Sequence, residues 1–135
     1  MNDFNQRIIE EFRANRGRVG GPFEGTPVLL LTTTGARTGQ TRTTPVAFLP
    51  DGQRLVIFAS RGGAPNNPGW YHNLLANPSA TVEVGDEQFK VTATVTSGEE
   101  RQRLFDRQAE RSPQFGEYQH KTTRQIPVIA LQRES

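Results

Sequence analysis

The chain has 135 residues, 33% of them hydrophobic, and a net charge of +2. This length predicts one domain, and the apolar residues fall in clear runs, so a globular protein is expected rather than a disordered one. The lack of cysteine excludes disulfides and thiolate metal sites, no run approaches the ~20 apolar residues of a membrane span, and the first residues do not resemble a signal peptide. A soluble cytoplasmic protein is therefore expected.

Residues 3–15 are predicted to form an amphipathic helix. Phe4, Ile8, Ile9 and Phe12 recur at helical spacing and share one face. Packing of this face on the body of the domain is favoured. The alternative is peripheral contact with a lipid surface at the inner face of the cell membrane, which Glu10 and Glu11 make less favourable. A linker rich in glycine and arginine follows, so residues 1–25 form a predicted N-terminal segment and 26–135 a predicted barrel domain.

The rest of the chain alternates short apolar runs with turn signals, which predicts strands. They are expected at residues 27–33, 42–49, 55–59, 80–84, 88–96 and 126–131. Short helices are expected at 68–77, with Asn67 as N-cap, at 98–111, with Ser97 and Glu100 as a capping box, and at 115–121. About six antiparallel strands with short helices predict a mainly β, α+β fold built on a small barrel.

The connection between the first two predicted strands is the most distinctive stretch. It carries Gly35 and Gly39, two arginines, Arg37 and Arg42, and many threonines. Glycine allows tight bends and lets backbone N–H groups approach a ligand, and arginine offers a planar fork of donors to phosphate or carboxylate. Two interpretations remain: an anion-binding hairpin or an ordinary polar hairpin.

The distribution of charge favours anion binding. Residues 26–80 contain four arginines and one acid, a net charge of +3, which leaves −1 for the rest of the chain. A second loop in the same segment, residues 60–64, places Ser60 and Arg61 beside two glycines. A concentrated positive field attracts anions, so the two loops are expected to hold two parts of one polyanionic ligand.

No strong catalytic constellation is visible. His72 and His120 are the only histidines, which is too few for a metal site, and Ser60 lacks the context of a nucleophile elbow. There is no P-loop and no dinucleotide fingerprint. Either the protein only binds a ligand, or a cofactor carries the chemistry.

Several blocks of the chain, in order, resemble the deazaflavin-dependent nitroreductase family. These blocks are TTGARTGQTR at 33–42, DG at 51–52, ASRGGA at 59–64, NPGWYHNL at 67–74, ANP at 76–78, YQ at 118–119 and RQIP at 124–127. The resemblance implies a split β-barrel related to flavin-binding barrels. It also implies hydride transfer from the reduced deazaflavin coenzyme F420, whose tail carries a phosphate and polyglutamate, to a quinone, a nitroaromatic or another electron-poor acceptor.

The resemblance also implies positions for the site. Contacts with the phosphate and tail fall on Arg37, Thr38, Gly39, Gln40, Arg42, Ser60 and Arg61. The wall beside the ring falls on Pro45, Ala47, Gly69, Trp70 and Asn73, and the substrate-side aromatics are Phe115 and Tyr118. Tyr118 either donates a proton to the reduced acceptor or orients it.

Several positions depart from the family pattern. Ala36 replaces the first member of a common basic pair, and Arg37 and Arg61 stand where lysine is common, which keeps the charge but changes the donor geometry. Gly69 replaces a larger side chain, and Phe115 lacks the hydroxyl that a tyrosine would supply. These changes bear on the acceptor more than on the coenzyme. The alternatives are a flavin- or haem-binding relative on the same barrel, a non-catalytic F420 carrier and a nucleic-acid-binding barrel. The chain is expected to be a monomer or a homodimer.

Overall fold

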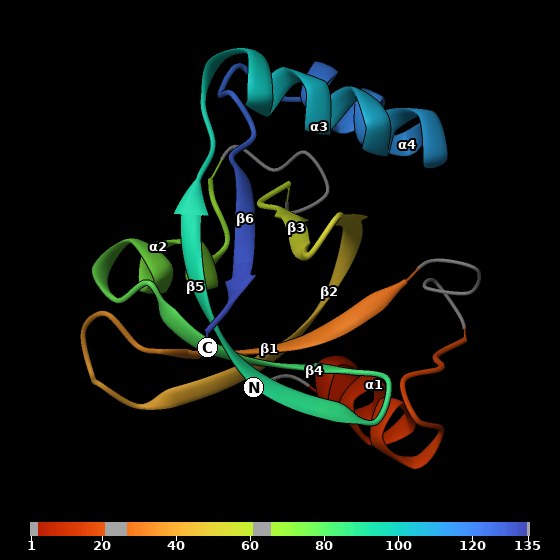
Figure 1. Ribbon diagram of the computed structural model, residues 1–135, viewed down its shortest axis with the longest axis vertical. Coiled ribbons are helices and arrows are strands. Elements are labelled where there is room, and N and C mark those ends of the chain that lie inside the picture. Colours follow the sequence, from red (N-terminus) through yellow and green to blue (C-terminus); the bar gives the residue numbers. More distant parts are fainter. Residues whose placement is uncertain (1–2, 21–26, 61–65, 135) are drawn as a thin grey trace.

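The computed structural model describes residues 3–20, 27–60 and 66–134, which contain four helices and six strands (Figure 1). In chain order the elements are α1 (Asp3–Ala14), β1 (Val28–Thr34), β2 (Thr41–Asp51), β3 (Arg54–Phe58), α2 (Gly69–Ala76), β4 (Ser79–Val84), β5 (Glu87–Val95), α3 (Gly98–Arg111), α4 (Gln114–His120) and β6 (Val128–Arg133).

The six strands form one closed barrel in the order β1-β2-β3-β6-β5-β4, and every neighbouring pair is antiparallel. The predicted barrel is therefore confirmed. The last strand begins at Val128, two residues later than the apolar run that starts at Ile126. Ile126 is instead held by side chains of α3 and α4.

Strand alternation separates an inner from an outer face. Val46 and Phe48 of β2 point into the barrel, whereas Ala47 and Leu49 point outward. The inner side chains form the main core: Leu29, Leu31, Val46, Phe48, Ile57, Ala59, Leu74, Ala80, Val82, Val91, Ile129 and Leu131. Leu74 comes from α2, so this helix closes one end of the barrel.

The N-terminal helix packs on the outer face of the barrel. Ile9 and Phe12 are buried against Leu30 of β1, and Arg13 makes two hydrogen bonds to Glu83 of β4 at 3.1 and 2.9 Å. The apolar side chains of α1 that the structure describes therefore face the barrel, as the favoured interpretation predicts. Across the described ranges, no helix is both long and apolar enough to cross a membrane.

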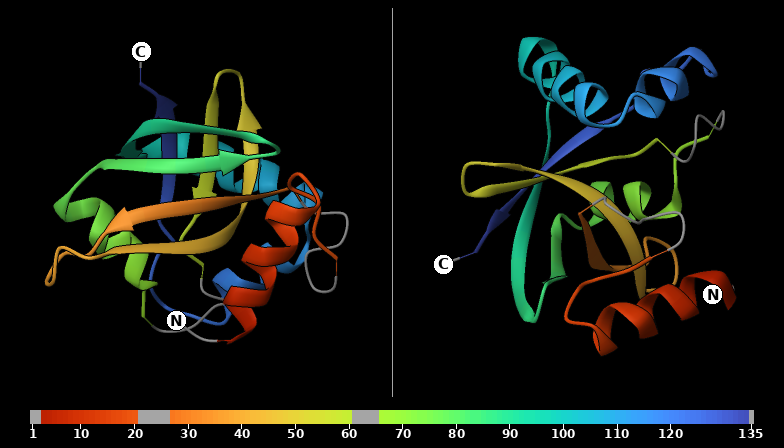
Figure 2. Two further views of the ribbon diagram at one scale, coloured as in Figure 1. Left: turned by 90° about the horizontal axis from the view of Figure 1, so that it is seen from below. Right: turned by 90° about the vertical axis from the view of Figure 1, so that its right-hand side faces the viewer.

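The other two outer helices, α3 and α4, cover β3 and β6. Leu104, Phe105 and Phe115 pack against Phe58 and Val128. The ring centroids of Phe58 and Phe115 lie 5.7 Å apart in an edge-on arrangement. Figure 2 shows α1 on one side of the barrel and the α3–α4 pair on the opposite side.

Asp51 fastens the turn between β2 and β3 to α3. Its carboxylate accepts hydrogen bonds from Arg54 at 2.6 Å and Arg107 at 2.9 Å, and Arg103 lies 3.7 Å away. The hydrogen bond from Arg54 is the largest cause of a lowered Asp51 pKa. Three arginines are therefore committed to one carboxylate and are not available to a ligand.

Two helix starts differ from the prediction: the capping box of α3 is not formed, and the N-cap of α2 lies one residue later than predicted. Ser97 is the N-cap of α3 but makes no side-chain cap hydrogen bond, and the carboxylate of Glu100 binds Arg54 instead. Pro68, not Asn67, is the N-cap of α2. The Asn67 side chain accepts a hydrogen bond from Arg124, so in both cases a tertiary partner takes the group that would cap.

Candidate functional site

The loop between β1 and β2 is tightly closed by its own hydrogen bonds. The Gly35 amide donates to the Gln40 carbonyl at 2.7 Å, the Gly39 amide to the Gly35 carbonyl at 3.0 Å, and the Gln40 amide to Thr38 Oγ1 at 3.2 Å. Gly39 has φ +74°, and a Cβ on Gly35 would lie 3.1 Å from the Gln40 carbonyl. The three amides are thus used inside the loop, contrary to the expectation that they face a ligand.

The loop instead presents its two guanidinium groups. Arg37 and Arg42 are exposed, and neither makes an ion pair or hydrogen bond within the residues the structure describes. The arginines around Asp51, by contrast, are paired. Among the described residues of the central segment, the unpaired positive charge therefore lies on this hairpin.

Asn73 of α2 locks the hairpin in place. Its Oδ1 accepts from the Ala36 amide at 3.0 Å, and its Nδ2 donates to Thr33 Oγ1, also at 3.0 Å. Thr33 is buried and pairs in register with Arg42. Because cross-strand partners share a face, Arg42 lies on the side of the hairpin that meets α2.

Trp70 lies one turn before Asn73 on the same helix. It is half-buried and packs against the main barrel core. Gly69 beside it is exposed, and a Cβ there would meet no atom within 4 Å. The hairpin tip, Arg42, Asn73 and Trp70 therefore gather at the end of the barrel that α2 closes.

A second group of predicted residues lies on the outer face of β2. Pro45 is buried and pairs with Leu30, the residue beneath α1. Ala47 packs against the cluster that contains Phe115, and Tyr118 packs against the same cluster. The rings of Phe115 and Tyr118 are in edge-on contact at 5.2 Å, so the two predicted acceptor aromatics lie near Ala47 of the predicted ring wall, whereas Trp70 packs on the inner cluster.

The second predicted loop is described only in part. Ser60 is buried, and its carbonyl accepts a hydrogen bond from Arg124 at 2.9 Å. Arg61 falls outside the described residues. Within those residues, no group of three or more histidines and carboxylates is placed to hold a metal ion.

Sequence reasoning assigned no role to Arg101, Gln119 and Arg124. Arg101 is buried and donates to the Ile126 carbonyl and to Gln119, and Gln119 in turn donates to the Arg124 carbonyl. Gln119 and Arg124 lie in the short blocks that carry the family resemblance. Those blocks were the only signal for Gln119 and Arg124, because no local pattern indicates which group a side chain will contact.

The arrangement suits one class of ligand. Two unpaired guanidinium groups lie on a rigid loop, and the loop is fixed to a helix that presents a half-buried tryptophan. Small and apolar residues of β2 and two aromatic side chains of α4 continue along the barrel. This donor set fits a long molecule with a flat ring and an anionic tail.

The comparisons with known proteins agree on one family. A family model described as F420H(2)-dependent quinone reductase matches residues 5–133. An F420H(2)-dependent quinone reductase of Mycobacterium tuberculosis is 43% identical over 126 residues, which cover 90% of this chain and 85% of that protein.

Two solved structures resemble the whole barrel. An F420-H2 dependent reductase (FDR-A) has a TM-score of 0.72 and 39% identity, covering 78% of this chain and 94% of its own. A domain-swapped dimer has a TM-score of 0.74 and 35% identity, covering 96% of this chain and 98% of its own.

Proposed function

The chain belongs to the F420H(2)-dependent quinone reductase family, and from this premise we propose that it reduces a quinone held beside Tyr118. Coenzyme F420, in its reduced form, supplies the hydride in this family. The nitroaromatics and other electron-poor rings suggested by the sequence are further candidate acceptors. The protein's part is to bind, orient and shield the two reactants.

We assign the anionic tail of the coenzyme to the hairpin. Arg37 and Arg42 supply the positive charge, and Thr38, Gly39 and Gln40 form the loop that carries them. Ser60 and Arg61 are assigned to the second tail contact. The observation that carries the proposal is that the two exposed, unpaired guanidinium groups lie on a loop bonded directly to the helix of Trp70.

We assign the ring to the wall formed by Trp70, Gly69, Ala47 and Pro45. A tryptophan face offers a flat apolar surface to an aromatic ring. The open space beside Gly69 leaves room for the ring next to that face. Asn73 contributes by holding the hairpin to α2, because both ends of its amide are bonded to β1 and the loop.

We assign the acceptor to the side of the barrel covered by α4. Hydride addition to a quinone leaves negative charge on an oxygen, and a nearby phenol can neutralise that charge by proton transfer. Tyr118 is the phenol available there, and the contact with the Phe115 ring fixes its orientation. Phe115 has no hydroxyl, so Tyr118 carries this role alone on α4.

The reaction is tested by mixing the purified chain with reduced F420 and a menaquinone analogue and following the return of oxidised F420 absorbance. We expect quinone-dependent oxidation, and tighter binding of F420 than of FMN. Preference for FMN or haem would favour the flavin- or haem-binding alternative. Binding of F420 without turnover on any quinone would favour the carrier.

Replacing Tyr118 with phenylalanine removes one hydroxyl and keeps the ring that packs against Phe115. Turnover is expected to fall about 100-fold, the usual scale of a lost general acid, while the affinity for F420 stays unchanged. Steady-state rates at saturating F420, together with a coenzyme titration, measure both quantities. Unchanged turnover would leave Tyr118 only the orienting role.

Two assembly states stay predictions: a monomer and a homodimer. A homodimer gains support from the related structure that is a domain-swapped dimer. Peripheral contact with the inner face of the cell membrane also stays a prediction. The described apolar residues of α1 do not favour that contact, because Ile8, Ile9 and Phe12 are buried.

A further inference from the structure

Arg124 bridges two points of the chain that flank the second ligand loop. Its Nη2 donates to the Ser60 carbonyl at 2.9 Å, and its Nη1 donates to Asn67 Oδ1 at 2.5 Å. Ser60 comes two residues after β3, and Asn67 comes two residues before α2, the helix of Trp70. One guanidinium therefore ties Ser60, close to the end of β3, to Asn67, close to the start of α2.

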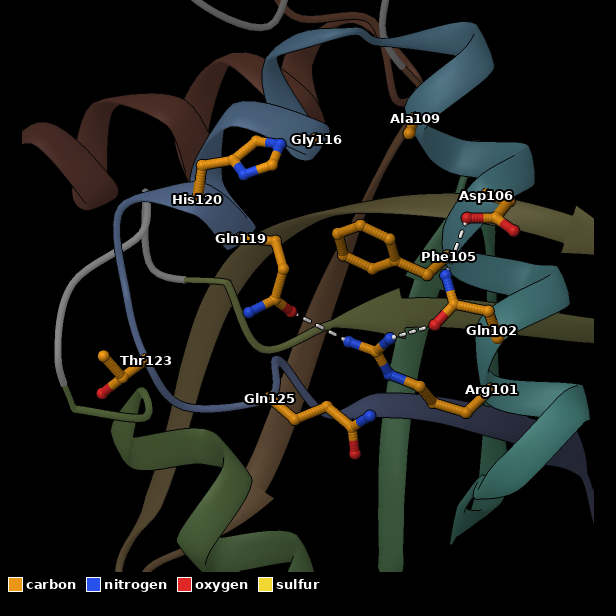
Figure 3. Close-up of a pocket in the computed structure, with 10 residues that line it drawn as sticks. All are labelled: Arg101, Gln102, Phe105, Asp106, Ala109, Gly116, Gln119, His120, Thr123 and Gln125. Atoms are coloured by element: carbon orange, nitrogen blue, oxygen red, sulfur yellow. Dashed lines mark hydrogen bonds between the residues drawn. The ribbon is translucent and has the colours of Figure 1, made fainter.

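The backbone that carries Arg124 is itself held firmly. Gln119 Nε2 donates to the Arg124 carbonyl at 2.7 Å, and Gln119 Oε1 accepts from the Ile126 amide at 3.0 Å. The same Oε1 accepts from the buried Arg101 at 3.1 Å, a contact drawn in Figure 3. Arg101 also donates to the Ile126 carbonyl at 2.7 and 3.2 Å, so residues 124–126 are clamped against α3 and α4.

These contacts form one connected series across the molecule. Gln119 is the chain neighbour of Tyr118 on α4 and holds the backbone of Arg124. Arg124 in turn holds Ser60 and the approach to α2. The contacts thus link α4, which is assigned to the acceptor, with Ser60 and α2, which are assigned to the coenzyme.

A cavity lies next to these contacts and is lined by residues of α3, α4 and the segment after α4. It measures about 450 Å³, and its walls include Arg101, Phe105, Gln119 and His120. Neither Phe115 nor Tyr118 lines it. The guanidinium of Arg101 is directed to carbonyl and amide oxygens of the protein, so the cavity gives no sign of a ligand and the series is the more informative feature.

We propose that Arg124 is a positioning residue for coenzyme binding, which acts by holding Ser60 and Asn67 in the arrangement that F420 requires. The inference rests on the proposed function. A planar fork reaches two acceptors at once, which a lysine ammonium does not do with the same geometry. Holding Ser60 and Asn67 in place before binding removes ordering cost from the binding step, so affinity for the coenzyme rises.

The first test compares Arg124→Lys with Asn67→Ala. Lysine at position 124 keeps the positive charge but does not donate to both oxygens in the geometry of the guanidinium. Alanine at position 67 removes one of the two acceptors, Asn67 Oδ1, and leaves Arg101 and Gln119 unchanged. Each change is expected to weaken F420 binding about tenfold, the scale of one lost hydrogen bond to a charged group. Rates at saturating coenzyme should fall much less, giving a change mainly in KM for F420.

A double-mutant cycle separates positioning from direct contact. If Arg124 acts through Asn67, the double variant binds F420 no more weakly than Arg124→Lys alone. Arg133→Lys is the matched control. Arg133 also donates to an oxygen, the carboxylate of Glu87, but it lies on β6, away from Ser60 and Asn67. Its F420 affinity should equal that of the parent.

Parent-like affinity in Arg124→Lys would overturn the inference, because charge alone would then suffice. Fully additive losses in the double variant would also overturn it, because Arg124 would then act independently of Asn67. A thermal unfolding scan on each variant identifies loss of folding, and Asn67→Ala keeps the test decisive if Arg124→Lys does not fold. Failure of the parent itself to bind F420 would instead contradict the proposed function.

Discussion

Removing both hairpin guanidinium groups with Arg37→Ala and Arg42→Ala is expected to weaken F420 binding about 100-fold, since each charge-assisted contact contributes about tenfold. Both side chains are exposed and unpaired in the described part of the chain. Their substitution therefore breaks no internal contact, and the free energy of unfolding should stay nearly unchanged. The two substitutions are therefore expected to lower the affinity for F420 without lowering the stability of the fold.

Ionic strength gives this prediction a second signature. The Debye length is about 30 Å at 0.01 M salt and about 3 Å at 1 M. The parent should lose affinity steeply as salt rises, and the double variant much less. Fluorescence titrations of F420 at low and high salt measure both slopes.

Two controls identify the source of the loss. Lys90→Ala with Arg111→Ala removes the same net charge from exposed positions on β5 and α3, and should leave affinity close to that of the parent. A deazaflavin fragment without the phosphate and polyglutamate should bind the parent and the hairpin variant equally. Equal F420 affinity in the parent and the hairpin variant would contradict the tail assignment.

The barrel was predictable because its signals are local. Phe89, Val91 and Ala93 alternate with polar residues in β5, and this period of two marks the face that packs on the barrel core before any partner strand is known. The same holds for α1, where Ile8, Ile9 and Phe12 share one helical face. The hairpin glycines were also readable, since Gly39 adopts a positive φ and turn chemistry is local.

The parts that escaped prediction depend on contacts between distant residues. Asn67 and Ser97 carry the right side chains for caps, but Arg124 engages Asn67 and α3 begins without a bond from Ser97. Asn73 was assigned to the ring wall, yet its amide is bonded to Thr33 and Ala36. Local propensity describes what a residue can do, and tertiary partners decide which option is used.

Gln119 connects α4 with α3 and with the segment that precedes β6, which the pattern of its own helix does not predict. Its side chain satisfies the Ile126 amide, the Arg124 carbonyl and the Arg101 guanidinium. Within the described ranges the buried Arg101 forms no ion pair, and desolvation lowers its pKa, opposed by the charge of Asp106. Arginine nevertheless stays charged in proteins, so its donors need the neutral oxygens that surround them.

Gln119→Leu is accordingly expected to lower the free energy of unfolding by about 2 kcal/mol or more, because the Ile126 amide and the Arg124 carbonyl lose a part-buried hydrogen bond and each unsatisfied buried group costs about 1–3 kcal/mol. Urea unfolding followed by the fluorescence of Trp70 measures the change.

Gln102→Leu is the matched control: its amide also accepts from Arg101, at 3.2 Å, but the residue is exposed. Water can replace that bond, so the control should lose less than about 1 kcal/mol. Equal losses of unfolding free energy in the two variants would contradict this prediction. Gln119 would then stabilise the fold no more than an exposed residue does, and its bonds to residues 124–126 would add no further stability.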